Sequence, residues 1–95
     1  MIAQVILSRF ESLTERDVKS TVMGMTGSDV TLSEAAASLF PYDIEAKNQE
    51  IFTSIYKFYD QADKHGDLEP LLIIKMNSKK PLAIVDLDHF ISLQK

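Results

Sequence analysis

The 95-residue chain contains no cysteine. Disulfides, zinc–thiolate sites and cysteine nucleophiles are therefore excluded, and a reducing compartment is permitted. An excess of positive charge is also missing, because 10 Lys and Arg stand against 14 Asp and Glu, which gives a formal net charge of −4. Domains that grip nucleic acid by bulk electrostatics carry a marked basic excess. Any DNA binding must therefore depend on local lysine clusters and on a metal that neutralises the acids.

Long hydrophobic runs are absent as well. No run approaches the length that crosses a membrane, and the first seven residues lack the basic start and long apolar block of a signal peptide. We therefore expect a cytoplasmic protein without a membrane segment. With no repeat, linker or low-complexity tract, the sequence predicts one domain over residues 1–95. Chains of this size often complete their core or their site by dimerising.

Hydrophobic spacing, turn residues and capping residues divide the chain into short elements. In order they are a helix over 2–13, a strand over 17–23, a glycine-marked turn over 24–28, a strand over 29–32, a helix over 34–39 capped by Ser33, a strand over 42–47, a helix over 49–64, strands over 71–74 and 82–85, and a final helical turn or two capped by Asp88. The continuous apolar runs of the last two strands favour strands covered on both faces. This order predicts an α/β sandwich around a mixed sheet.

The segment Asp43-Ile44-Glu45-Ala46-Lys47 alternates charged and apolar residues, so in an extended strand its charged side chains leave on one face. A further acid, Asp29, follows the glycine-marked turn. Two carboxylates, a backbone carbonyl and waters suit a magnesium-class ion, and Asp29, Glu45 and the Ala46 carbonyl are the candidate ligands. Lys47 lies about 7 Å along the strand from Glu45, where it would orient the nucleophile or stabilise developing charge. The pattern predicts metal-dependent phosphodiester cleavage.

These residues resemble the PD-(D/E)XK nuclease superfamily, with Ser28-Asp29-Val30 at the first acid and Glu45-Ala46-Lys47 as the Glu-x-Lys element. Residues 23–33 and 40–50 are similar to the core of small phage nucleases described as Holliday-junction resolvases, and the likeness extends over 17–93. It implies a restriction-endonuclease-like core with a mixed four- or five-stranded sheet flanked by helices. It also implies Mg²⁺-dependent cleavage of DNA, with Mn²⁺ as a substitute.

The resemblance assigns two supporting residues and meets one departure. Many relatives carry a glutamate on the first helix as a further metal ligand, and Glu11 is the best candidate, with Glu15 behind it. Gln61 resembles a glutamine that some members bring near the metal, although a hydrogen bond to backbone is equally compatible with its position. Ser28 stands where the superfamily signature has proline.

Contacts to DNA are expected from a few exposed polar residues. A duplex that reaches the site needs phosphate contacts that position it without reading sequence. We expect these from Lys79 and Lys80 in the C-terminal hairpin and, with less weight, from Lys19. Asn48 lies at the rim of the expected site, where it caps the long helix or contacts DNA.

Other patterns favour structural roles. Asp86 and Asp88 share a strand face and could imitate a metal pair, but Asp88 suits an N-cap. Tyr56 and Tyr59 lie beside Phe52, which favours core packing over a base-stacking platform. The two histidines have no partner at ligand spacing, so a histidine general base is not expected.

The sequence therefore predicts a structure-selective DNA endonuclease, resolvase-like, that acts on branched or duplex DNA as a homodimer, because two symmetric cuts need two sites at a fixed separation. A homing or nicking endonuclease of the same superfamily is the first alternative. A catalytically silent DNA-binding or assembly module is the second. A helix-turn-helix regulator over 14–40 ranks last, because its second helix carries no Arg or Lys for a base edge.

Overall fold

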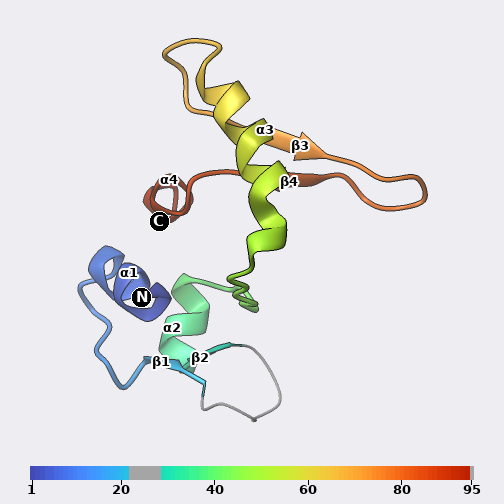
Figure 1. The fold of residues 1–95 in the computed structure, drawn as a ribbon. Coiled ribbons are helices and arrows are strands. Elements are labelled where there is room, and N and C mark those ends of the chain that lie inside the picture. The colour runs from blue at the N-terminus through green and yellow to red at the C-terminus, as the bar shows by residue number, and fades with distance from the viewer. Residues whose placement is uncertain (22–28, 95) are drawn as a thin grey trace. The chain divides into compact units, whose positions relative to one another are not determined.

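The computed structural model describes residues 1–21 and 29–94, and its contacts divide the chain into two compact units (Figure 1). The first unit comprises Met1–Lys47 and Phe90–Lys95, and the second comprises Asn48–His89. The elements are α1 (Ile2–Arg9), β1 (Val18–Ser20), β2 (Val30–Leu32), α2 (Glu34–Leu39), the 3-10 helix η1 (Glu50–Phe52), α3 (Thr53–Asp63), β3 (Leu72–Ile74), β4 (Leu82–Ile84) and α4 (Leu87–Ser92). Within these described ranges no helix has the length and apolar character needed to span a membrane.

The first unit has a packed apolar core. α1 contributes Ala3 and Ile6, which share a face at a three-residue spacing. The backbone turns extended at Phe10 (φ −119°, ψ 97°), so the helix predicted over 2–13 ends at Arg9. The full set of buried residues is Ala3, Ile6, Phe10, Leu13, Val18, Val30, Ala36, Phe40 and Ile91.

β1 and β2 form an antiparallel pair in which Val18 lies opposite Leu32. The pair confirms the strand predicted over 29–32, except its first residue, and the middle of the strand predicted over 17–23, whose last two residues lie outside the described ranges. Both strands begin with a buried valine, which places one side of the pair on the core. The turn predicted over 24–28 lies outside the described residues.

A network of side-chain hydrogen bonds fixes the start of α2. The Ser33 hydroxyl oxygen accepts a bond from the Ala36 N–H at 3.1 Å and donates to Asp17 Oδ1 at 2.7 Å. Asp17 Oδ2 accepts from the Thr14 N–H at 2.8 Å. These bonds, the Thr14 amide first and the Ser33 hydroxyl second, lower the pKa of the Asp17 carboxyl. The helix predicted over 34–39 and its Ser33 cap are confirmed.

Four aromatic rings gather where α2 ends. The ring of Phe40 lies 4.7 Å from that of Tyr42, 6.1 Å from that of Phe90 and 6.4 Å from that of Phe10, centroid to centroid. The Tyr42 and Phe90 rings meet edge to face at 5.2 Å. Such tilted and edge-to-face contacts favour a fixed ring arrangement. They anchor the start of the segment that leads to Glu45.

The second unit consists of η1, α3 and the antiparallel β3–β4 hairpin, in which Ile73 lies opposite Ala83. It confirms the predicted hairpin and most of the long helix. None of residues 48–89, all of which the structure describes, is buried. The prediction that both hairpin strands are covered on both faces is wrong, because Ile73 is 56% exposed.

The predicted mixed four- or five-stranded sheet is also wrong. The described residues form two separate two-stranded antiparallel sheets, β1–β2 in the first unit and β3–β4 in the second, within a small α/β protein. The strand predicted over 42–47 does not form. There the Ala46 N–H donates to the Asp29 carboxylate at 2.6 Å instead of to the carbonyl of a neighbouring strand. A side chain thus takes the place of a ladder partner.

The cap of α4 differs from the prediction by two residues. The His89 N–H donates to Asp86 Oδ2 at 3.0 Å, which is the bond from N-cap side chain to third helical residue. Asp88 lies inside the helix, in its first turn. The N-cap is therefore Asp86, because the helix begins at Leu87.

Candidate active site

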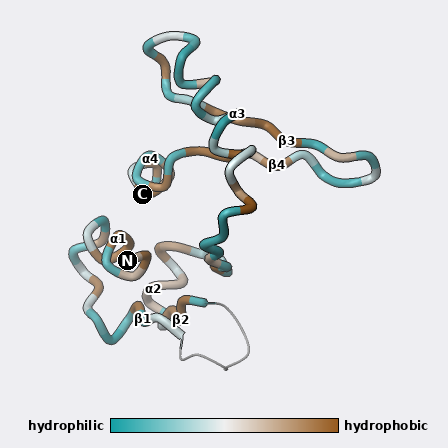
Figure 2. Tube along the Cα trace, viewed as in Figure 1, coloured by the Kyte–Doolittle hydropathy of each residue, from teal (hydrophilic) through white to brown (hydrophobic). Residues whose placement is uncertain are grey.

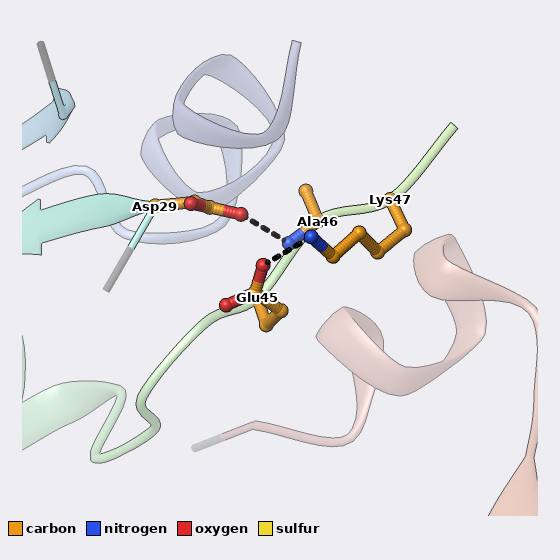
Figure 3. Close-up of polar contacts among 4 residues, drawn as sticks. All are labelled: Asp29, Glu45, Ala46 and Lys47. Carbon is orange, nitrogen blue, oxygen red and sulfur yellow. Dashed lines mark hydrogen bonds and ion pairs between the residues drawn. The ribbon is translucent and has the colours of Figure 1, made fainter. Parts of the chain in front are cut away.

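Asp29 connects β2 to the Glu-x-Lys segment in the first unit. Its own N–H donates to the Ile44 carbonyl at 2.7 Å, and its Oδ2 accepts the Ala46 N–H at 2.6 Å. Ile44 is half-buried and packs against the core, so the segment is fixed from both its apolar side and its backbone. Asp29 and Ala46 are brought together across the intervening chain, as Figure 3 shows.

Glu45 and Lys47 lie on either side of Ala46 in sequence, and their side chains meet. Lys47 Nζ is 3.3 Å from Glu45 Oε2, and Figure 3 shows the lysine folded back toward the glutamate. Both side chains are well exposed, at 58% for Lys47 and 64% for Glu45. An ion pair this exposed contributes about 0–1 kcal/mol. Little energy therefore holds Lys47 to Glu45, and the amine has freedom to approach another anion.

The candidate donor atoms are all oxygens, the type of ligand that a hard cation prefers. Asp29 and Glu45 supply carboxylate oxygens and Ala46 supplies a backbone carbonyl, all from one small region of the first unit. Oxygen ligands of this type are what Mg²⁺ prefers, with waters or phosphate in the other positions. Within residues 1–21 and 29–94 no group of three or more acidic, histidine or cysteine side chains gathers as a metal site. The structure therefore does not add Glu11, which is exposed just after α1, to Asp29 and Glu45.

No protein-family model, curated protein or solved structure matches this chain. The likeness to PD-(D/E)XK nucleases thus stands on the motif residues alone. In the first unit, one hydrogen bond joins Asp29 to the Glu45-Ala46-Lys47 segment.

The other predicted site residues are divided between the units. Lys19 is an exposed residue of β1 in the first unit. Lys79 and Lys80 are exposed residues between β3 and β4 in the second. Asn48 and Gln61 line one surface pocket of about 650 Å³ along η1 and α3, also in the second unit.

The lining of that pocket includes a residue whose role the sequence misassigned. Tyr56 is 68% exposed and lines the pocket with Lys57 and Lys64, so its predicted place in a core is wrong. Tyr59 is half-buried, and partial burial, reinforced by the charges of Glu69 and Asp86, raises the pKa of its hydroxyl. Nothing in the sequence indicated that Tyr56 and Tyr59 would differ in exposure, because both lie beside Phe52 in the aromatic pattern of the helix.

The most specific feature of the site was not foreseen. The sequence predicts that Asp29 and Glu45 converge as ligands, whereas the structure shows Asp29 as the hydrogen-bond acceptor of Ala46. A carboxylate that follows a turn is a common acceptor of backbone N–H groups. Sequence spacing alone does not say which N–H, because the partner lies far along the chain.

Proposed function

We propose that this protein is a metal-dependent DNA endonuclease of the PD-(D/E)XK type. The observation that carries the proposal is the hydrogen bond from the Ala46 N–H to the Asp29 carboxylate. It places one acid of the motif against the backbone between the other acid, Glu45, and the lysine, Lys47. That hydrogen bond joins Asp29 to the segment that carries Glu45 and Lys47, whose side chains are exposed.

Each residue has a defined task in this proposal. Asp29, Glu45 and the Ala46 carbonyl would hold Mg²⁺, or Mn²⁺ in its place. Such an ion would supply an activated water and neutralise phosphate oxygens. Lys47 leaves its exposed pairing with Glu45 and stabilises negative charge on the phosphate, or orients the attacking water. The chain has a net charge of −4, so the ion also offsets the repulsion between these carboxylates and DNA.

The proposed substrate is branched DNA, cut by a homodimer in the manner of a junction resolvase. Two sites related by a two-fold axis can cut two strands symmetrically. Lys19 is the proposed phosphate contact in the first unit. Asn48 and Gln61 share a pocket with Lys57 and Lys64, whose ammonium groups are proposed phosphate contacts, and with the acids Glu50 and Asp60.

The test is cleavage of a four-way junction in Mg²⁺ by the purified chain. Asp29→Asn, Glu45→Gln and Lys47→Ala should each reduce the rate about 100-fold or more, as removal of one electrostatic stabiliser does. Asp63→Asn, which neutralises an exposed carboxylate of the second unit outside the pocket that Asn48 and Gln61 line, is the matched control and should cut at the wild-type rate. Equal cleavage by wild type and Lys47→Ala would remove Lys47 from the mechanism.

Linear duplex, flap and nicked substrates distinguish the related activities. A preference for the junction supports the resolvase-like proposal, whereas cutting at one duplex sequence, or on one strand only, supports a homing or nicking endonuclease. The scaffold alone does not select among them.

A catalytically silent DNA-binding module is the second candidate, and a specific observation favours it. Asp29 already accepts the Ala46 N–H, Lys47 already pairs with Glu45, and the described residues gather no third acid. Such a module would bind junction DNA without cutting it. Calorimetry would then show no Mg²⁺ or Mn²⁺ binding that Asp29→Asn or Glu45→Gln removes.

A further inference from the structure

The β3–β4 hairpin has two apolar faces in different environments. Alternate residues of a strand point to opposite sides. Leu72, Ile74, Leu82 and Ile84 share one side, and α3 contacts β3. Three of these side chains are half-buried, whereas Leu82, next to the hairpin tip, is 58% exposed. On the other side Ile73 and the facing Ala83 are exposed. We call Leu71, Ile73 and Ala83 the outer hairpin face; Leu71, 53% exposed, precedes β3 and continues its alternation.

This face needs a cover that the second unit does not supply. A lone two-stranded hairpin is marginally stable in water, and units near 40 residues usually depend on disulfides, metals or association. The chain has no cysteine, and its described residues gather no metal-binding group. Residues 48–89 also bury no side chain fully. A surface from outside the second unit would supply the burial that these residues lack.

The two ends of the hairpin carry opposite charge. Its tip holds Lys75, Lys79 and Lys80, and residues 75–81 contain no acid. Its base holds Asp67 and Glu69, the latter 3.6 Å from His89. Figure 2 shows the apolar strands between the hydrophilic tip and base. Lys75 lies six residues beyond Glu69, roughly 20 Å along an extended chain, which exceeds the screening length of about 8 Å. The ends therefore act as separate charges.

We propose that a second copy of this chain covers the outer hairpin face. The two copies pack face to face about a two-fold axis, with the hairpins running in opposite directions. The lysine tip of each copy then lies over the acidic base of the other, and both charge pairs form at once. The reverse arrangement would set tip against tip and base against base. The surface complements itself in one orientation, so no partner of different chemistry is required.

This surface is argued from the second unit alone and does not depend on nuclease activity. It gives Lys79 and Lys80 a role at a dimer interface in place of the DNA contact expected from the sequence. The two roles make different predictions, because a dimer contact acts without DNA.

Sedimentation equilibrium of the full chain, over a range of concentrations at physiological salt and without DNA, tests the proposal. The wild type should be a dimer, and Ile73→Glu should weaken the dimer at least tenfold. Ile51→Glu is the matched control, because Ile51 is an exposed apolar residue (77%) of η1 outside the outer hairpin face. It should dimerise like the wild type, and both variants should keep the wild-type circular dichroism.

A monomeric wild type would overturn the proposal. That is the result expected if the first unit, or a different protein, covers the face. A dimer that Ile73→Glu leaves unchanged would also overturn it, because the interface would then lie elsewhere.

A charge exchange tests the orientation without altering the apolar residues. One variant carries Lys79→Glu with Lys80→Glu, and the other carries Asp67→Lys with Glu69→Lys. Each variant alone should dimerise with an affinity at least tenfold lower than that of the wild type. An equimolar mixture should form a mixed dimer with the affinity restored. Failure of the mixture to associate would overturn the proposed orientation. If the first variant stays dimeric and loses affinity for DNA, the lysines contact DNA and the proposal is wrong.

Discussion

In the first unit, side chains from α1, β1, β2, α2 and the end of α4 meet in one core, whereas the second unit places one helix against one hairpin and buries no residue. The contrast does not come from a shortage of apolar residues. Most of the large apolar side chains that the structure leaves exposed belong to the second unit, among them Ile51, Phe58 and Ile73. Two packed elements share a single interface, so each keeps an uncovered side. Several elements around a common centre do not have this problem.

The largest expected effect comes from equivalent truncations in the two units. Ile6→Ala removes a side chain with no exposed surface and should lower the free energy of unfolding by about 2–5 kcal/mol. Ile51→Ala removes a side chain that is 77% exposed and should change it by about 0.5 kcal/mol or less. Urea unfolding of both variants measures the difference. Similar losses would mean that Ile51 is buried in solution.

A smaller effect should follow from loss of the α2 cap. Ser33→Ala removes the acceptor of the Ala36 N–H and should cost about 1 kcal/mol. α3 has no capping side chain, so Ser54→Ala near its start is the control and should change stability little. Thermal unfolding measures both variants. If Ser33→Ala were neutral, the cap would not contribute to the first unit.

The smallest effect, and the only one that depends on pH, concerns Asp17. Hydrogen bonds from the Thr14 amide and the Ser33 hydroxyl lower the pKa of this carboxyl below its ordinary 3.8. A lowered pKa in the folded state means stability that is present above that ordinary value and lost as the pH falls through the folded one. Asp17→Asn should therefore lower the Tm at pH 7.

The difference between Asp17→Asn and wild type should shrink below about pH 4. Asp60→Asn, at an exposed position of α3, should show no such trend. A constant deficit at every pH would mean that the asparagine disturbs packing and that charge has no part in it.

The sequence predicted those features whose causes are local. Ser33 caps α2 because its hydroxyl reaches the N–H three residues further along the chain. The apolar runs on either side of residues 75–81 pair with each other as a hairpin, because they are close in sequence. The single mixed sheet failed because strand order depends on contacts between distant segments. Residues 42–47 show the same limit, since their alternation did not reveal that Asp29 would take the ladder bond.

The sequence named the residues of the candidate site but did not predict the contacts among them. Glu45 and Lys47 form an ion pair although the strand expected to align them does not form, and Asp29 is joined to the same segment through the Ala46 N–H. Exposure was harder to foresee, as Tyr56 shows, because a helix face is buried only where another surface covers it.

Asp29 would have two roles in the proposed nuclease, because the carboxylate that accepts the Ala46 N–H is also the proposed metal ligand. Asparagine retains an acceptor for that amide and lacks the charge, whereas alanine abolishes both. The pair Asp29→Asn and Asp29→Ala therefore separates architecture from chemistry at a single position. A ligand that shifted the Asp29 carboxylate would also shift the Ala46 backbone next to Lys47. Ligand binding at Asp29 and the position of the Lys47 amine are therefore coupled in this proposal.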